Sequence, residues 1–281
     1  MKRVIFSADD FGLDPAVNDA VEIAHRDGLL DATSLMVGEA AAAAAVAVAQ
    51  RSPGLRVGLH VALVEATPVS DPADIPDLVD GSGRFPGDMV SAGFRFFFKP
   101  GVRAQLAREI RAQFEAFRRT GLALDHANTH KHIHLHPTVA RLIVEIGREY
   151  GLKAMRLPVE PPGPVAAAEG HAVAGSLGAA ALRAWTGQLR AMLKRQGLVT
   201  NDQVFGLAWS GAMTPERVAG IIHRLPEGLS ELYVHPATAG GFEGAAPGYR
   251  YAEELSALVA AETVDALRNS GATLGSFSTF A

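Results

Sequence analysis

The chain has 281 residues, enough to bury a substantial core; 48% of them are hydrophobic, 20% are charged, and the formal net charge is −4. This composition excludes a largely disordered chain, and the negative charge gives no electrostatic reason to expect a nucleic acid partner. Because it has no cysteine, the chain can form neither disulfides nor thiolate metal sites.

Residues 1–12 combine a basic start and a short apolar run with two acids, which predicts a first strand rather than a signal peptide. The apolar stretch 40–49 is shorter than the roughly 20 residues that a membrane-spanning helix needs. We therefore expect a cytoplasmic protein without a transmembrane segment.

Strands are predicted where short apolar runs are bounded by glycine, proline or polar residues. In chain order these runs are 3–8, 33–37, 56–60, 123–129, 154–157, 203–208, 231–234 and 273–277. The amphipathic runs between them predict helices at 15–27, 40–50, 102–120, 137–150, 177–196, 215–224 and 251–269. Asp14, His136 and Thr214 each precede a proline, a residue that suits the first position of a helix.

This alternation of strands and helices predicts a parallel sheet with helices outside it. Seven or eight repeats favour closure, so we expect an α/β fold with one (β/α) barrel, TIM-like and regular or irregular, over residues 1–281. Two long segments, 64–100 and 159–178, interrupt the pattern. Since both follow strands, they are predicted to form active-site loops at the C-terminal face.

Asp9 and Asp10 end the first predicted strand, and adjacent carboxylates repel each other unless a cation lies nearby. Neighbouring strand residues point to opposite sides, so the chain must twist or turn here if both are to face one site. Gly12 permits such a turn. The alternative is that Asp10 simply caps the following helix.

Further candidates are histidines at or near strand ends. His60 ends the strand 56–60, and on its own a histidine in such a place is more often structural than a metal ligand. Histidines are concentrated between positions 126 and 136, at His126, His130, His132, His134 and His136. Most alternate along the chain, so an extended backbone would place their imidazoles on one face.

Neutral imidazole is the commonest metal-ligating side chain, and a row of unpartnered rings is an unlikely core. We therefore predict a metal-binding or catalytic role for this histidine segment. The alternatives are an incidental polar loop and a hydrogen-bonded cluster. The rings cannot all bind one ion, so some must contact the ligands or the substrate.

His235 and Arg156 lie at the ends of two other predicted strands, and a barrel would bring both to the same rim. An arginine there could orient an acid or a substrate oxygen, although a surface ion pair is equally compatible with its position. A shell of one carboxylate and two imidazoles suits Zn²⁺ and related divalent ions, and it leaves positions open for water and substrate.

At these residues the sequence resembles the YdjC-like carbohydrate deacetylase family, which includes chitooligosaccharide deacetylases. The resemblance extends over nearly the whole chain and is carried by the segments 8–12, 57–60, 128–134, 156–158 and 234–236. Within the family, residues 95–98 and 156–161 are most similar to the hopanoid biosynthesis-associated branch. Family membership implies a hydrolase that removes the acetyl group from an N-acetylated amino sugar. The branch implies that the substrate is an N-acetylglucosaminyl hopanoid, in which this sugar is attached to a lipid.

Carried over by position, the resemblance implies that Asp10, His60 and His130 bind one divalent ion, Mg²⁺ or Zn²⁺. It implies that Asp9 is the general base, and His235 stands where we expect the acid for the leaving amine. We expect the substrate contacts to include Arg156, His132 and His134. Lys131 interrupts a run that is often all histidine in the chitooligosaccharide branch, which bears on substrate subsites more than on the metal.

A lipid-linked substrate would also give the aromatic segment 94–98 a role in shielding the aglycone or in touching the inner face of a membrane. A loop buried on the barrel is the alternative. Three other functions stay open: deacetylation of soluble chitooligosaccharides, a metal-dependent phosphoesterase using Lys131, Lys153 and Arg156, and a non-catalytic sugar- or metal-binding protein. A homo-oligomer is compatible with all of them.

Overall fold

The computed structural model describes residues 1–170 and 177–281, leaving aside the side chains at 90, 94, 95, 97, 98, 100, 177–181 and 183. Its strands are β1 (Lys2–Phe11), β2 (Ala32–Leu35), β3 (Arg56–Val61), β4 (Leu124–Thr129), β5 (Gln203–Phe205), β6 (Gly228–Val234) and β7 (Thr273–Leu274). They form one parallel sheet in the order β4-β3-β2-β1-β6-β5, with β7 beside β1. The predicted parallel α/β fold is therefore confirmed.

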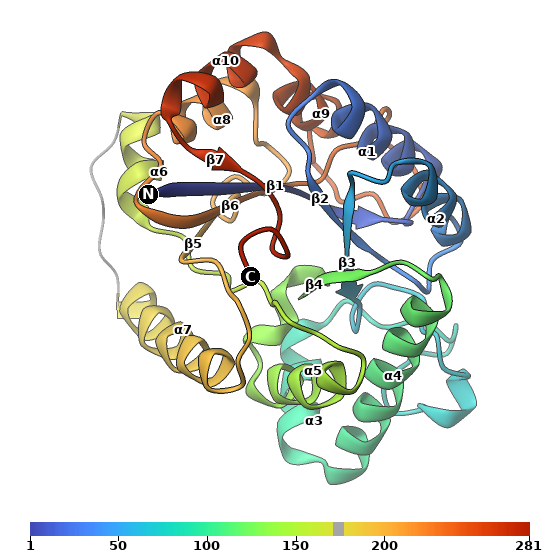
Figure 1. The fold of residues 1–281 in the computed structure, drawn as a ribbon. Coiled ribbons are helices and arrows are strands. Elements are labelled where there is room, and N and C mark those ends of the chain that lie inside the picture. The colour runs from blue at the N-terminus through green and yellow to red at the C-terminus, as the bar shows by residue number, and fades with distance from the viewer. Residues whose placement is uncertain (171–176) are drawn as a thin grey trace.

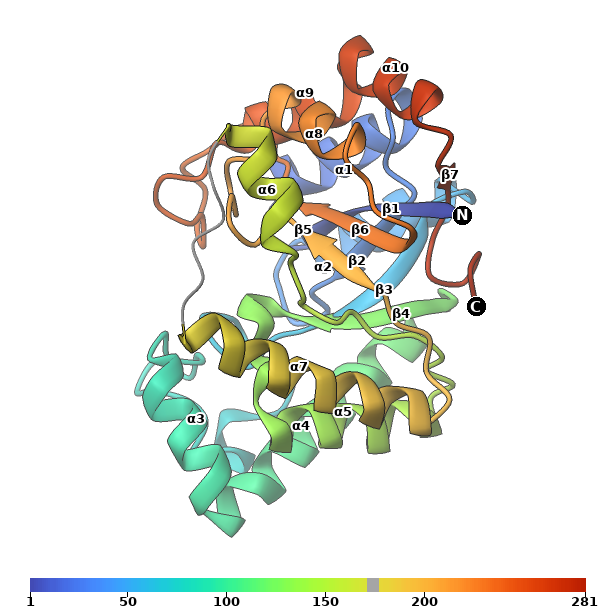
Figure 2. The same ribbon diagram turned by 90° about the vertical axis from the view of Figure 1, so that its left-hand side faces the viewer.

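The helices surround this curled sheet on its outer side (Figures 1 and 2). They are α1 (Pro15–Asp27), α2 (Ala42–Arg51), α3 (Met89–Phe98), α4 (Pro100–Arg119), α5 (Pro137–Glu149), α6 (Pro162–Glu169), α7 (Leu177–Arg195), α8 (Pro215–Ile222), α9 (Tyr251–Val259) and α10 (Ala261–Ser270), with short 3₁₀ helices η1 (Pro72–Asp74) and η2 (His130–Leu135). None of the helices in the described ranges is long and apolar enough to cross a membrane.

The sheet forms a half-barrel, and the closed barrel expected from the sequence is not confirmed. Within the described residues, no ladder of strand hydrogen bonds joins β4 to β5. The predicted strand 154–157 makes only isolated bridges, Ala127 to Met155 and Ala154 to Val199. The amide of Asn201 bonds both the N–H and the C=O of Leu157, and Pro158 follows without an N–H, so the ladder cannot continue.

The helix predictions were largely accurate, and their errors are informative. The predicted helix 251–269 is interrupted at Ala260, whose backbone is extended (ψ 135°), and so becomes α9 and α10. Both predicted long loops contain helices, α3 in 64–100 and α6 in 159–178, and part of the second loop, 171–176, lies outside the described residues. The segment after β4 is not extended as expected, because η2 begins at His130.

The half-barrel brings the carboxyl ends of its strands together at one end of the sheet. The opposite end is filled by the last residues of the chain, where Phe277 packs against Ile5, Ala32 and Leu229. Figure 1 shows the C-terminus close to the middle of the curled sheet. The site residues at the carboxyl ends of β1, β3, β4 and β6 therefore lie away from this filled end.

Candidate metal centre and active site

Asp9 and Asp10 lie at an irregularity in β1. The pairing with β2 shifts register between Ala8 and Phe11, and Asp10 has a left-handed backbone with φ of 64°. This bend lets both carboxylates face the same cavity although they are neighbours on a strand. The alternative role for Asp10 is wrong, because the side chain that caps α1 is that of Asp14.

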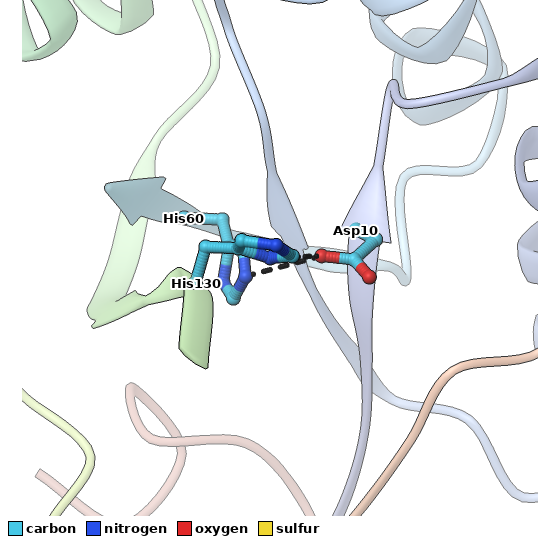
Figure 3. Close-up of side chains that lie close together, drawn as sticks. All are labelled: Asp10, His60 and His130. Atoms are coloured by element: carbon cyan, nitrogen blue, oxygen red, sulfur yellow. Dashed lines mark hydrogen bonds and ion pairs between the residues drawn. The ribbon is translucent and has the colours of Figure 1, made fainter. Parts of the chain in front are cut away.

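Asp10, His60 and His130 converge from three strand ends (Figure 3). Asp10 Oδ1 lies 3.2 Å from His60 Nε2 and 3.0 Å from His130 Nδ1, and one ligand atom from each residue lies within 4.8 Å of the others. The two imidazoles meet nearly edge-on, with ring centroids 5.6 Å apart. It is the one group of this kind found among the described residues.

The contacts of His60 show why a cation fits between these groups. Its Nδ1 lies 2.7 Å from Asn128 Oδ1, an atom that can only accept a hydrogen bond, so the proton of a neutral ring sits on Nδ1. Asn128 Nδ2 donates to Asp9 Oδ1 at 2.9 Å, which fixes the orientation of the amide. His60 Nε2 then directs a lone pair at the Asp10 carboxylate, a repulsion that a bound divalent ion would relieve.

Asp9 is held by a dense set of donors. Arg156 donates to both of its oxygens, at 2.5 Å to Oδ2 and 2.9 Å to Oδ1, while Ser34 and Asn128 also donate to Oδ1. Burial by itself would raise the pKa of Asp9, but the charge and the hydrogen bonds of Arg156 hold it well below its ordinary value. Asp9 is therefore a fixed carboxylate, and Oδ2 is its less occupied oxygen.

Arg156 does not line the cavity and has no exposed surface. Its Nη2 donates to Glu231 Oε1 at 2.8 Å as well as to Asp9, and its guanidinium lies over the ring of Tyr233. Of the roles expected from the sequence, the geometry favours orienting an acid over contacting substrate. The surface ion pair considered as the alternative is wrong, because both ion pairs are buried.

His235 lines the cavity from the end of β6, and its side chain is 12% exposed. Its Nδ1 lies 3.7 Å from Glu254 Oε2, a carboxylate with no exposed surface. Burial alone would lower the pKa of His235, but Glu254, Asp10 and Asp9 outweigh that effect and raise it to about 9. The imidazole is therefore protonated at neutral pH.

The remaining histidines of the 126–136 segment separate. His132 Nε2 pairs with the Tyr233 hydroxyl at 3.1 Å beside the cavity, where burial holds its pKa well below the ordinary value. His134 is fully buried, bonded to Thr129 and to the carbonyl of Arg156. His126 is buried beside Phe277, and His136 contacts Phe96. One face for all the rings is thus wrong, because the left-handed Lys131 and His132 turn the chain into η2.

The candidate metal ligands, together with Asp9 and His235, border a cavity of about 160 Å³. Its lining residues are Asp9, Asp10, His60, Glu65, His130, Lys131, His132, Leu207, Ser210, Tyr233, His235, Gly244, Ala246, Tyr249 and Tyr251.

Backbone strain is concentrated at this cavity. Within the described chain, the non-glycine residues with positive φ are Asp10, Glu65, Lys131 and His132, and all four line it. Such conformations cost about 1–3 kcal/mol each and persist where surrounding structure enforces them. Their concentration here supports a functional role for the cavity.

Sequence reasoning missed three residues that organise the site. Asn128 sets the His60 tautomer and bonds Asp9, Ser34 bonds Asp9, and Glu254 contacts His235. Asn128 and Ser34 could have been found from their places near the ends of the two strands beside β3. Asn128 is paired with His60 across the sheet, and Ser34 is paired with Gly58. Glu254 gave no such signal, because it lies on a helix, directly after a half-exposed glutamate.

Comparisons with known proteins give a family match and several curated relatives. A model of the YdjC-like protein family matches residues 3–269. The chain is 36% identical over 163 residues to a carbohydrate deacetylase from Brevibacillus brevis, covering 57% of this chain and 59% of the relative. A carbohydrate deacetylase from Vibrio cholerae is 36% identical over 150 residues, covering 53% of this chain and 56% of the relative. The matches thus span less than two thirds of these curated relatives.

One solved structure supports the fold over the full chain. It is a protein of Enterococcus faecalis V583 with a provisional assignment to cellobiose-phosphate cleavage, with a TM-score of 0.78 and 23% identity. The match covers 100% of this chain and 99% of that protein. At this identity the likeness establishes the shared architecture of the half-barrel.

Proposed function

Because the chain belongs to the YdjC-like protein family, we propose that it is a metal-dependent hydrolase that removes the acetyl group from N-acetylated amino sugars. The observation that carries this proposal is the arrangement around the cavity. A candidate Asp-His-His metal site, a fixed carboxylate and a protonated imidazole line the same small space. The deacetylase relatives named above supply the reaction class.

Asp10, His60 and His130 would hold the divalent ion, Mg²⁺ or Zn²⁺, whose charge would polarise the acetyl carbonyl and favour the ionisation of a bound water. Asp9 Oδ2 then accepts the proton of the water whose oxygen attacks the carbonyl carbon. Arg156 keeps Asp9 fixed and ionised throughout the neutral range, so that its Oδ2 is unprotonated when it meets the water.

His235 completes the reaction at the nitrogen. An amine is a poor leaving group until it is protonated, so breaking the C–N bond needs an acid beside that atom. His235 is charged at neutral pH and lines the cavity together with Asp9. It gives its proton to the nitrogen as the bond breaks, which leaves acetate and a free amino sugar.

A finer proposal is that the amino sugar is carried by an apolar aglycone, as in an N-acetylglucosaminyl hopanoid. An open groove of about 350 Å³ adjoins the metal cavity at Leu207, which lines both. Its other lining residues are Pro158, Val159, Glu160, Pro162, Leu182, Thr186 and Ala208. The segment 156–161, which carries the likeness to the hopanoid-associated branch, supplies part of this lining.

The groove offers a better-defined place for an aglycone than the aromatic segment 94–98, which lies in α3. There Phe96 is buried against His136, and the side chains at 94, 95, 97 and 98 lie outside those described. Replacing the exposed Leu182 with glutamate should lower the rate on a lipid-linked N-acetylglucosaminide and leave a soluble glycoside unaffected. Equal rates on both substrates in the unmodified protein would remove the lipid proposal.

The general proposal is tested by acetate release. The purified protein, supplied in turn with Mg²⁺ and Zn²⁺, is assayed on N-acetylglucosamine glycosides, chitooligosaccharides and a lipid-linked N-acetylglucosaminide. We expect acetate from at least one of them, abolished by chelation and restored by the metal. Release of phosphate from sugar phosphates, with no acetate from any N-acetylated sugar, would favour the phosphoesterase alternative instead.

A further inference from the structure

Glu254 is a fully buried carboxylate that joins three parts of the structure around His235. It lies on α9, and its Oε2 accepts a hydrogen bond from the backbone N–H of His235 at 2.5 Å. Its Oε1 accepts from the N–H of Met213, in the loop before α8, at 2.8 Å. The same Oε2 lies 3.7 Å from His235 Nδ1. One side chain therefore fixes the end of β6 and faces the ring.

The contacts of Glu254 specify a charged group. Both oxygens accept from N–H donors, so the neutral amide of a glutamine would direct its NH₂ group at one of them. Removing a carboxylate from water is costly unless hydrogen bonds or an opposite charge compensate it. The two backbone donors and a protonated His235 provide that compensation. In return, a carboxylate within about 4–6 Å favours the charged form of the imidazole.

Other charged or titratable groups face His235 from β1 and η2. Asp9 and Asp10 are the nearby acids on β1, and His132 approaches from η2. Asp9 is already paired with Arg156, and Asp10 belongs to the candidate metal site. The aromatic rings of Tyr233 and Tyr249 contact His235 without adding charge. Glu254 is thus the neighbouring acid whose charge is not committed to another cation.

We propose that Glu254 is a positioning residue that orients His235 and holds it protonated for donation to the leaving amine. This inference rests on the proposed function, since it assigns His235 to the acid step. Glu254 does not line the cavity and so acts only through His235. With Nδ1 turned towards Glu254, Nε2 is the ring nitrogen left to serve the substrate.

The experiment compares Glu254→Gln, Glu254→Asp and Glu253→Gln. Glu253 is the matched control, because it lies next to Glu254 on α9 and makes an exposed ion pair with Arg250. The first readout is the pKa of His235, measured by NMR in the metal-free protein, with its resonance identified by its loss in His235→Gln. The second is the pH profile of kcat/KM for acetate release with metal supplied. Thermal unfolding of each variant is measured alongside.

In the unmodified protein we expect a His235 pKa near 9, falling by about one to two units in Glu254→Gln. The alkaline limb of kcat/KM should move down by the same amount, which lowers the rate at pH 8 by about two- to tenfold. Glu254→Asp should retain most of the raised pKa, because it keeps the charge. Glu253→Gln should match the unmodified protein in both readouts.

An unchanged His235 pKa in a folded Glu254→Gln protein would overturn the proposal, whatever happened to the rate. An equal loss in Glu254→Asp, with no movement of the alkaline limb, would also overturn it, because it would indicate a purely structural role. If Glu254→Gln does not fold, a His235 pKa at or below 6.5 in the unmodified protein decides against the proposal. The NMR measurement needs no turnover, so an absence of deacetylase activity would count against the proposed function separately.

Discussion

Two clusters of aspartate and histidine lie at opposite ends of the half-barrel and differ in what surrounds them. At the carboxyl ends of the strands, Asp10 meets His60 and His130 beside a cavity. Near the start of β4, Asp125 pairs with His126 at 2.9 Å beneath the C-terminal residues. Both clusters contain the same residue types, and His126 belongs to the histidine-rich segment from which the metal site was predicted.

The two clusters differ in how many side chains converge and in whether a cavity lies beside them. The imidazoles of His60 and His130 approach Asp10 from two other strand ends, and all three side chains border a cavity. Asp125 instead accepts from the adjacent His126 and from the N–H of Ser278, which leaves it 4% exposed in a filled interior. Residue type alone therefore does not distinguish a candidate metal ligand from a buried hydrogen-bonded pair.

The largest effect should come from removing the carboxylate of the first cluster. Asp10→Ala removes the carboxylate that lies between the two imidazoles of the candidate metal site. We therefore expect divalent metal binding and acetate release to fall to background together. Calorimetric titration with Zn²⁺ and the acetate assay measure the two quantities. Asp125→Asn is the matched control at the other cluster, and loss of metal binding in that variant would break the comparison.

Asp9→Asn should separate metal binding by the first cluster from proton transfer by the neighbouring Asp9. The amide keeps the size of the side chain but cannot accept the proton of the attacking water. We expect metal affinity to stay within a few-fold of the unmodified protein while kcat falls by about 10²–10⁴-fold. A variant with full activity would remove Asp9 from the role of base.

The next largest effect should be on stability, and it should come from removing the buried guanidinium of Arg156. Arg156→Met would leave the carboxylates of Asp9 and Glu231 buried without their cation, and breaking such a pair costs about 3–5 kcal/mol. Chemical denaturation at pH 7 measures the change in the free energy of unfolding. A loss below about 1 kcal/mol would indicate that water or protonation replaces the guanidinium easily.

The smallest effect should come from the second cluster and should depend on pH. Burial alone would raise the pKa of Asp125, but the hydrogen bonds from His126 and Ser278 hold it below its ordinary value. A depressed pKa stabilises the fold above the unfolded-state pKa, near 3.9, and that stabilisation is lost as the pH falls further. Asp125→Asn should therefore cost about 1–2 kcal/mol at pH 7 and less near pH 3. Denaturation curves at both pH values test this, with acetate release expected to stay unchanged.

The sequence predicted most of the helices and the approximate places of most strands because their signals are local. Hydrophobic periodicity, the prolines after Asp14 and Thr214, and the polar residues closing β1, β3 and β6 can each be recognised within a few residues. Because parallel strands place their carboxyl ends at one edge of a sheet, the meeting of Asp10 with His60 could be expected before the structure was known.

Only the tertiary structure decided which of these residues face the cavity. Three features involve partners far away in the chain: the missing ladder at Leu157, the pairing of His132 in η2 with Tyr233, and the burial of Arg156 between Asp9 and Glu231. Periodicity carries no information about such partners. The sequence by itself determined the chemistry available to this protein, whereas long-range packing decided where each group stands and whether it has space beside it.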